Sequence, residues 1–193
     1  MGLEQRSQIT DVQFTASTSY DFSTVANQAR LNNVANGRMV GAWIPRFKDD
    51  QQWIQIDLLH PKNITGIVTQ GRPGHNQWVK SYIVRTSLDG VNFIPITDFG
   101  KTTPLIFAGN IDHETPKTQI FGQKISARFV RVYPVTFETS IALRLELLGC
   151  FVPAVTGTGT TSTTTQTTGS TPVTPPLSKF LVTFNIWSEA FEL

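Results

Sequence analysis

The chain has 193 residues, of which 39% are hydrophobic and 16% are charged, and its formal net charge at pH 7 is +2. A net charge this small does not by itself indicate a nucleic-acid partner, and no apolar run approaches the roughly 20 residues of a membrane-spanning helix. The hydrophobic content is sufficient for one domain with a buried core.

The hydrophobic pattern over residues 3–151 has a period of two. Apolar and polar residues alternate at 54–58, 64–69, 82–87 and 141–148, which is typical of strands with one face on a core. Residues that favour turns separate these runs, at His60-Pro61, Arg72-Pro73-Gly74 and Asp89-Gly90. Asp89-Gly90 between two apolar runs predicts a hairpin. Several short strands at close spacing indicate an all-β sandwich or barrel.

The composition changes after this region. Nearly half of the residues from Ala154 to Pro176 are Thr, and none is charged, so residues 152–178 are predicted to form a disordered linker. Such a segment is either an O-glycosylated stalk or a plain flexible linker. The last residues, 179–193, contain the alternating run KFLVTFNIWSEAFEL. We interpret it as the start of a second module, weakly similar to an SEA module, or as a disordered C-terminus.

Motifs for catalysis, cofactors and metals are missing from the sequence. The three His residues are far apart and lack metal-ligand spacing. Asp98-Phe99-Gly100-Lys101-Thr102 contains part of a phosphate-loop pattern, but Pro95 stands where the loop needs Gly. Clustered Asp residues at 49 and 50 are either a calcium ligand pair or, more often, a solvated bend. We therefore predict that the chain is not an enzyme, binds no cofactor and holds no metal.

Two segments carry a resemblance to a known family. They are QWIQIDLLHPKNITGIVTQGRPGHNQWVKSYIVRTSL, which runs from Gln52 to Leu88, and SARFVRVYPVTFETSIALRLELLGC, which runs from Ser126 to Cys150. With QARLNN and Ala42-Trp43 before them, they resemble the discoidin domain, also called the coagulation-factor type C domain, over residues 2–151. The resemblance implies an eight-stranded jelly-roll β-barrel of the galactose-binding-domain-like class. Its termini would meet at one end, and loops at the other end would form a binding rim.

The family's usual disulfide is only half represented here. Cys150 matches the second cysteine of that bridge, and the first would lie upstream of Met1. We therefore expect a piece of a longer extracellular protein, either secreted or the ectodomain of a membrane protein. The alternative is a domain that works without the bridge and leaves Cys150 free. Asn63-Ile64-Thr65 is a glycosylation sequon, expected near a strand start on the surface.

Three loops would form the rim by resemblance: Tyr20–Gln28, Asn33–Gly41 and Gly71–Gln77. The candidate ligand contacts on them are Asp21, Phe22, Val25, Asn27, Arg38, Met39, Val40, Arg72, His75, Asn76 and Gln77. Met39 and Val40 are expected to protrude, because Asn36-Gly37-Arg38 and Gly41 flank them. Burial against the rim is the favoured alternative for Phe22 and Val25. The three central tryptophans, Trp43, Trp53 and Trp78, are expected to pack in the barrel.

These residues support two hypotheses about the ligand. The polar third loop, with Asp21 and Asn27 opposite, favours a glycan or protein partner in cell adhesion or matrix binding. The alternative is an anionic phosphatidylserine membrane, because apolar tips ringed by basic residues anchor proteins at such surfaces. The basic candidates are Arg30, Arg38, Arg46 and Arg72.

Overall fold

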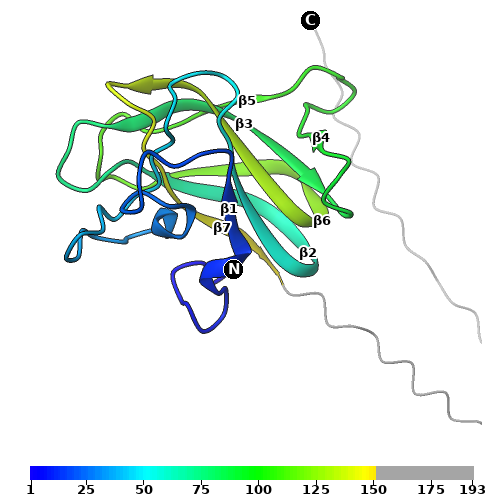
Figure 1. Cartoon of the computed structure of the whole chain (residues 1–193). Coiled ribbons are helices and arrows are strands. Elements are labelled where there is room, and N and C mark those ends of the chain that lie inside the picture. Colours follow the sequence, from blue (N-terminus) through cyan, green and yellow to red (C-terminus); the bar gives the residue numbers. More distant parts are fainter. Residues whose placement is uncertain (151–193) are drawn as a thin grey trace, which may run out of the picture. The chain divides into compact units, whose positions relative to one another are not determined.

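The structure is a computed structural model that describes residues 1–150 (Figure 1). The predicted linker at 152–178 and the predicted second module at 179–193 lie outside the described residues. The strands are β1 (Phe14–Ala16), β2 (Ile54–Gln70), β3 (Trp78–Ser87), β4 (Ile94–Pro95), β5 (Ile106–Ala108), β6 (Lys117–Glu138) and β7 (Arg144–Cys150). Two short 3₁₀ helices, η1 (Asp11–Gln13) and η2 (Ala26–Ala29), precede β2.

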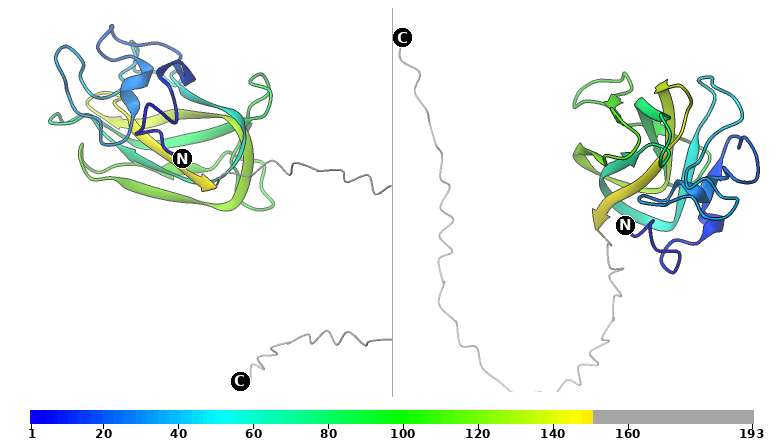
Figure 2. Two further views of the ribbon diagram at one scale, coloured as in Figure 1. Left: turned by 90° about the horizontal axis from the view of Figure 1, so that it is seen from below. Right: turned by 90° about the vertical axis from the view of Figure 1, so that its left-hand side faces the viewer.

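All strand pairs are antiparallel and belong to one sheet, in the order β1-β2-β6-β3-β4, with β5 beside β3 and β7 beside β2. The first part of β2 pairs with β1 and with the later part of β6. The second part of β2 pairs with β7 and with the early part of β6. The two long strands β2 and β6 therefore take part in both halves of the sheet, which curves around the core (Figure 2).

The core follows the alternation seen in the sequence. Ile54, Ile56 and Leu58 of β2 are buried, as are Tyr82 and Val84 of β3. Ile141, Leu143, Leu145 and Leu147 of the 141–148 run are buried as well. The all-β fold is thus confirmed, with seven assigned strands in the described part where eight were expected.

One of the predicted turns takes a different form in the structure. His60-Pro61 does not end a strand, because β2 continues through it with a register shift against β6 between Asp57 and Lys62. Leu59 absorbs the bend with a positive φ of 63°. The turn predicted at Arg72-Pro73-Gly74 is present, but it joins two strands that do not pair, because β6 lies between β2 and β3.

The hairpin predicted at Asp89-Gly90 is confirmed. β3 pairs with β4 through Arg85 with Pro95 and Thr86 with Ile94. The Asp89 carboxylate accepts the backbone N–H groups of residues 91 and 92, each at 2.8 Å, and these bonds hold the pKa of Asp89 well below its ordinary value.

The chain termini of this unit and the predicted rim lie at opposite ends. The Met1 amine donates to the Leu147 carbonyl at 2.9 Å and pairs with Glu146 at 3.2 Å. Strand β7 begins at Arg144 beneath the loops and runs away from them (Figures 1 and 2). The β2–β3 loop and the second rim loop lie at the left-hand end of Figure 1, while β4 lies at the right.

Candidate functional site

A cavity of about 370 Å³ opens among the rim loops. The first loop lines it with Tyr20, Asp21, Ser23 and Thr24, the second with Val40, and the third with Arg72 and Gln77. Ile44, Pro45, Arg46, Lys48 and Ser140 complete the wall. Three segments far apart in the sequence therefore meet at one hollow, which has a size common for small-ligand sites.

The first loop is folded around Asp21. Its Oδ1 accepts the backbone N–H of Ser23 at 2.8 Å and the Ser23 hydroxyl at 2.6 Å, and the hydroxyl bond is the main cause that lowers the pKa of this carboxyl. The Val40 N–H donates to the Ser23 carbonyl at 3.2 Å, which joins the first loop to the second. Phe22 lies outside this turn with 64% of its surface exposed.

The first loop's remaining candidates are less accessible. Val25 and Asn27 are half-buried, and neither lines the cavity. Asn27 Oδ1 accepts a hydrogen bond from Gln28 Nε2 at 3.1 Å. Their position beside the cavity and not in it makes them weaker contact candidates than Tyr20, which the sequence did not single out.

The second loop contains a tight turn. Asn36 and Met39 exchange two backbone hydrogen bonds, both 3.0 Å long, so Gly37 and Arg38 form an exposed tip. Met39 and Val40 are half-buried, and Val40 faces the cavity. The exposed apolar residue of this loop is Val34, at 61%.

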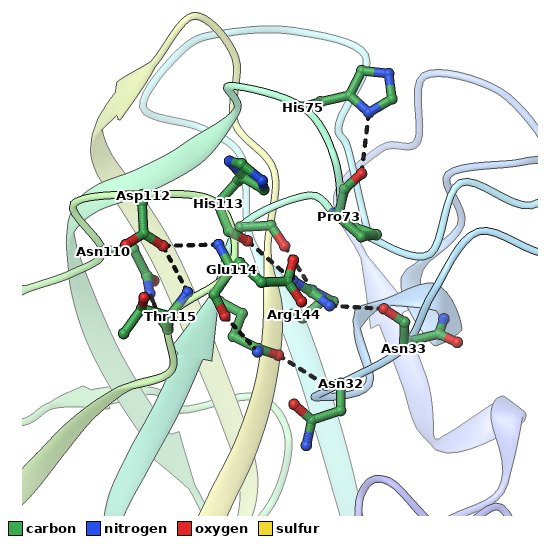
Figure 3. Close-up of polar contacts among 12 residues, drawn as sticks. Asn32, Asn33, Pro73, His75, Asn110, Asp112, His113, Glu114, Thr115 and Arg144 are labelled. Atoms are coloured by element: carbon green, nitrogen blue, oxygen red, sulfur yellow. Dashed lines mark hydrogen bonds and ion pairs between the residues drawn. The ribbon is translucent and has the colours of Figure 1, made fainter.

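The third loop presents polar groups. Arg72 Nη1 donates to Gln77 Oε1 at 3.0 Å, and the Arg72 N–H donates to the Gln77 carbonyl at 2.9 Å. The buried Nε of Arg72 has no hydrogen-bond partner within the described part of the chain. His75 and Asn76 are exposed at the tip, where His75 Nδ1 lies 3.1 Å from the Pro73 carbonyl (Figure 3).

A fourth wall of the cavity comes from residues 44–48. Arg46 and Phe47 are exposed, with the guanidinium 5.9 Å from the Phe47 ring centroid. Lys48 Nζ donates to the Thr139 carbonyl at 3.0 Å. Only Arg46 of this segment was predicted, although Pro45 is a residue that favours loops.

Several sequence-selected residues lie away from the cavity. Arg30 cannot supply rim charge, because it is 3% exposed and pairs with Asp11 at 2.6 Å and with the Leu3 carbonyl. Trp43 is fully buried and donates its indole N–H to the Thr18 carbonyl at 2.9 Å. The sequon residue Asn63 is half-buried inside β2, between β6 and β7.

The other two predicted core tryptophans are half-buried. The Arg131 guanidinium lies over Trp53, with its carbon 4.2 Å from the centroid of the Trp53 ring. Trp78 begins β3 directly after the third loop.

Metal and membrane features can be checked directly on residues 1–150. Within that range no three His, Cys, Asp or Glu side chains are grouped so that they could hold a metal ion. No helix in the same range is long and apolar enough to cross a membrane.

The sequence is similar to that of a known protein family. A sequence model of the F5/8 type C domain matches residues 13–147. The chain is 39% identical to rat (Rattus norvegicus) lactadherin over 158 residues, which cover 78% of this chain and 36% of lactadherin. It is 36% identical to Bombyx mori hemocytin over 152 residues, 79% of this chain and 5% of hemocytin.

A solved structure shares the fold. Recombinant discoidin II of Dictyostelium discoideum superimposes with a TM-score of 0.66 at 29% identity, over 75% of this chain and 57% of that chain. Among the sequence relatives, the present chain spans little more than a third of lactadherin and a small part of hemocytin.

Proposed function

The chain belongs to the F5/8 type C domain family, and on this premise we propose that it is an extracellular, non-enzymatic binding module for cell adhesion or matrix attachment. Its ligand is a glycan or a protein, held at the rim cavity. The observation that carries this proposal is the convergence of the three rim loops on one hollow of about 370 Å³.

The lining of the cavity suits a sugar. Tyr20 is 68% exposed at its margin and offers an aromatic face to a pyranose ring. Arg72 and Gln77 line the same cavity and are joined by a 3.0 Å hydrogen bond from Nη1 to Oε1. Pockets of this kind fix a ligand through a few placed polar groups.

A binding titration tests the glycan hypothesis. We expect Tyr20→Ala to weaken binding of a galactose-terminated oligosaccharide at least tenfold. Phe99→Ala is the matched control, because Phe99 is a fully exposed aromatic residue that does not line the rim cavity. Equal affinities of the two variants and the unaltered chain would contradict a sugar site at Tyr20.

A second candidate ligand is an anionic membrane, which a different observation favours. Phe22, Val34 and Phe47 are each more than half exposed, and Arg38 and Arg46 are exposed on the same loops. Apolar side chains that enter the interfacial region next to basic ones combine hydrophobic and electrostatic attraction.

Co-sedimentation with vesicles tests the membrane candidate. The full chain should pellet with phosphatidylcholine vesicles only when they contain phosphatidylserine, and Phe22→Ser should abolish pelleting. Val91→Ser is the control, because Val91 is equally apolar and 79% exposed in the β3–β4 loop. Equal pelleting with and without phosphatidylserine would rule out this mode of membrane binding. Unchanged pelleting of Phe22→Ser would rule it out as well.

A further inference from the structure

Arg144 is a fully buried arginine whose hydrogen bonds lead to three different loops. Its Nε donates to the Gly71 carbonyl at 2.7 Å, Nη1 to the Asn33 carbonyl at 2.8 Å, and Nη2 to the His113 carbonyl at 3.0 Å (Figure 3). Gly71 and Asn33 begin the third and second rim loops. His113 belongs to a loop between β5 and β6, at residues 109–115, that the sequence did not single out.

Among residues 1–150, Glu114 supplies the one carboxylate that forms an ion pair with Arg144. Glu114 Oε2 lies 3.3 Å from Nη2, but the Glu114 side chain is 61% exposed, so water screens this pair. Removing a guanidinium from water is costly unless its N–H groups are hydrogen-bonded. The loop carbonyls supply most of those bonds, and each is therefore held firmly to the same cation.

Gln70 repeats the arrangement on the neighbouring strand. It is directly opposite Arg144 in the β2–β7 register and is also buried. Its Nε2 donates to the Glu114 carbonyl at 2.8 Å, and its Oε1 accepts the Asn32 N–H at 2.8 Å. The two side chains thus bind the same pair of loops, at 32–33 and 113–114, from adjacent strands.

The 109–115 loop is also closed on itself. Asn110 Nδ2 donates to the Thr69 carbonyl at 2.9 Å and to the Thr115 carbonyl at 2.8 Å. Asp112 Oδ1 accepts the N–H groups of Glu114 at 2.8 Å and Thr115 at 2.6 Å. A loop braced in this way moves as a unit, so holding it at His113 and Glu114 fixes the whole segment.

We propose that Arg144 is a positioning residue that, together with Gln70, locks the loops 33–41, 71–77 and 109–115 into one unit. The 109–115 loop then becomes a fourth rim loop, which presents Ile111, 88% exposed, beside the binding surface. The positioning role stands on the geometry alone, whereas the ligand contact of Ile111 rests on the proposed function. Within residues 1–150, the three carbonyls that accept hydrogen bonds from the Arg144 side chain all belong to loops and not to strands.

Hydrogen exchange of the full chain tests the positioning role without a ligand. Arg144→Lys keeps the charge but cannot span three carbonyls. We expect amide protection in all three loops to fall at least tenfold, while protection in β3 stays unchanged. Arg128→Lys is the matched control, because Arg128 also makes a two-pronged contact, with Asp57, on residues that do not line the rim cavity. It should leave the three loops as protected as in the unaltered chain.

Other outcomes of the exchange experiment overturn the proposal. Unchanged protection in Arg144→Lys, or loosening of one loop alone, would show that the loops are held independently. If Arg144→Lys fails to fold, graded denaturant on the unaltered chain decides. The three loops should then open together, with one common dependence on denaturant, and separate openings would contradict the proposal.

Binding separates the positioning role from the proposed function. With phosphatidylserine vesicles or a galactose-terminated oligosaccharide, Arg144→Lys and Ile111→Ser should each reduce affinity at least fivefold, and Arg128→Lys less than twofold. If neither probe binds the unaltered chain, the proposed function fails for both the oligosaccharide and the membrane. The exchange result still decides the role of Arg144. Unchanged affinity of Ile111→Ser for a probe that binds would remove the fourth loop from the site.

Discussion

At the residue scale, arginine has several roles in this molecule that sequence position does not reveal. Arg38 and Arg46 are exposed on the rim, Arg72 is half-buried at the cavity, and Arg30 and Arg144 are buried. The sequence analysis placed Arg30 among the basic residues that could ring the rim. It is buried because Asp11 and the Leu3 carbonyl, from a distant segment, provide its partners.

The ion pair between Asp57 and Arg128 predicts a response to acid. Arg128 donates to both carboxylate oxygens of Asp57, at 2.8 and 2.9 Å, and this contact holds the pKa of Asp57 below its ordinary 3.8. A lowered pKa stabilises the fold above the unfolded-state value, and that contribution is lost as the pH falls through the folded-state pKa. Asp57→Asn should therefore lower the free energy of unfolding at neutral pH.

Urea unfolding of both proteins across pH measures their free energies of unfolding and checks the direction of this pH dependence. The difference between Asp57→Asn and the unaltered chain should shrink as the pH is lowered below 3.8. A difference that is constant with pH would show that the carboxylate charge contributes nothing and that only packing was changed.

Backbone geometry in the second rim loop gives a prediction that compares two glycines. Both Gly41 and Gly37 have a positive φ, of 76° and 58°. A Cβ on Gly41 would lie 2.5 Å from the Val34 backbone, whereas a Cβ on Gly37 would meet nothing within 4 Å. Gly37→Ala should cost about 1 kcal/mol for the φ alone, and Gly41→Ala more than about 2 kcal/mol. Urea unfolding measures both, and equal costs would contradict the close contact with Val34.

At the scale of elements, local alternation identified the strands that face the core but not where they end. The pattern at 54–58 and 64–69 correctly placed two buried runs, yet the structure joins them into one strand through His60-Pro61. The joining depends on pairing with β6, where Asp57 pairs with Phe129 and Lys62 with Ala127, and period-two reasoning contains no information about partners so distant in the sequence. For the same reason alternation assigned Arg144 to the outer face of β7 and could not show that loops cover it.

The bend of β2 predicts which glycine is essential to the sheet. Gly66 lies at the second register shift, and a Cβ there would come within 2.5 Å of the Gln119 carbonyl on β6. Gly66→Ala should destabilise the fold by about 1–3 kcal/mol, because the two strands must move apart. Gly122 on β6 is the control, since its Cβ would meet nothing within 4 Å. A thermal unfolding scan that ranks Gly122→Ala as the more damaging change would contradict this account of the bend.

At the scale of the whole molecule, the fold brings together loops that the sequence keeps far apart. The resemblance to discoidin domains indicated three of them, because their positions follow the family pattern. Within residues 44–48 it indicated only Arg46, and it did not indicate residues 109–115, which we propose as a fourth rim loop on the basis of the Arg144 contacts. Tyr20 and Val34 lie in loops that the resemblance indicated, but their exposure, like that of Phe47, depends on packing that alternation and turn residues do not report.

The central claim is that this rim, and no other face, binds the ligand. Amide chemical-shift mapping of the full chain, titrated with the oligosaccharide and with phosphatidylserine vesicles, tests it most directly. The account predicts that the perturbed amides for the probe that binds fall in residues 20–48, 71–77 and 109–115. Perturbations centred on the β3–β4 loop and residues 97–105, where Val91 and Phe99 are exposed, would contradict it.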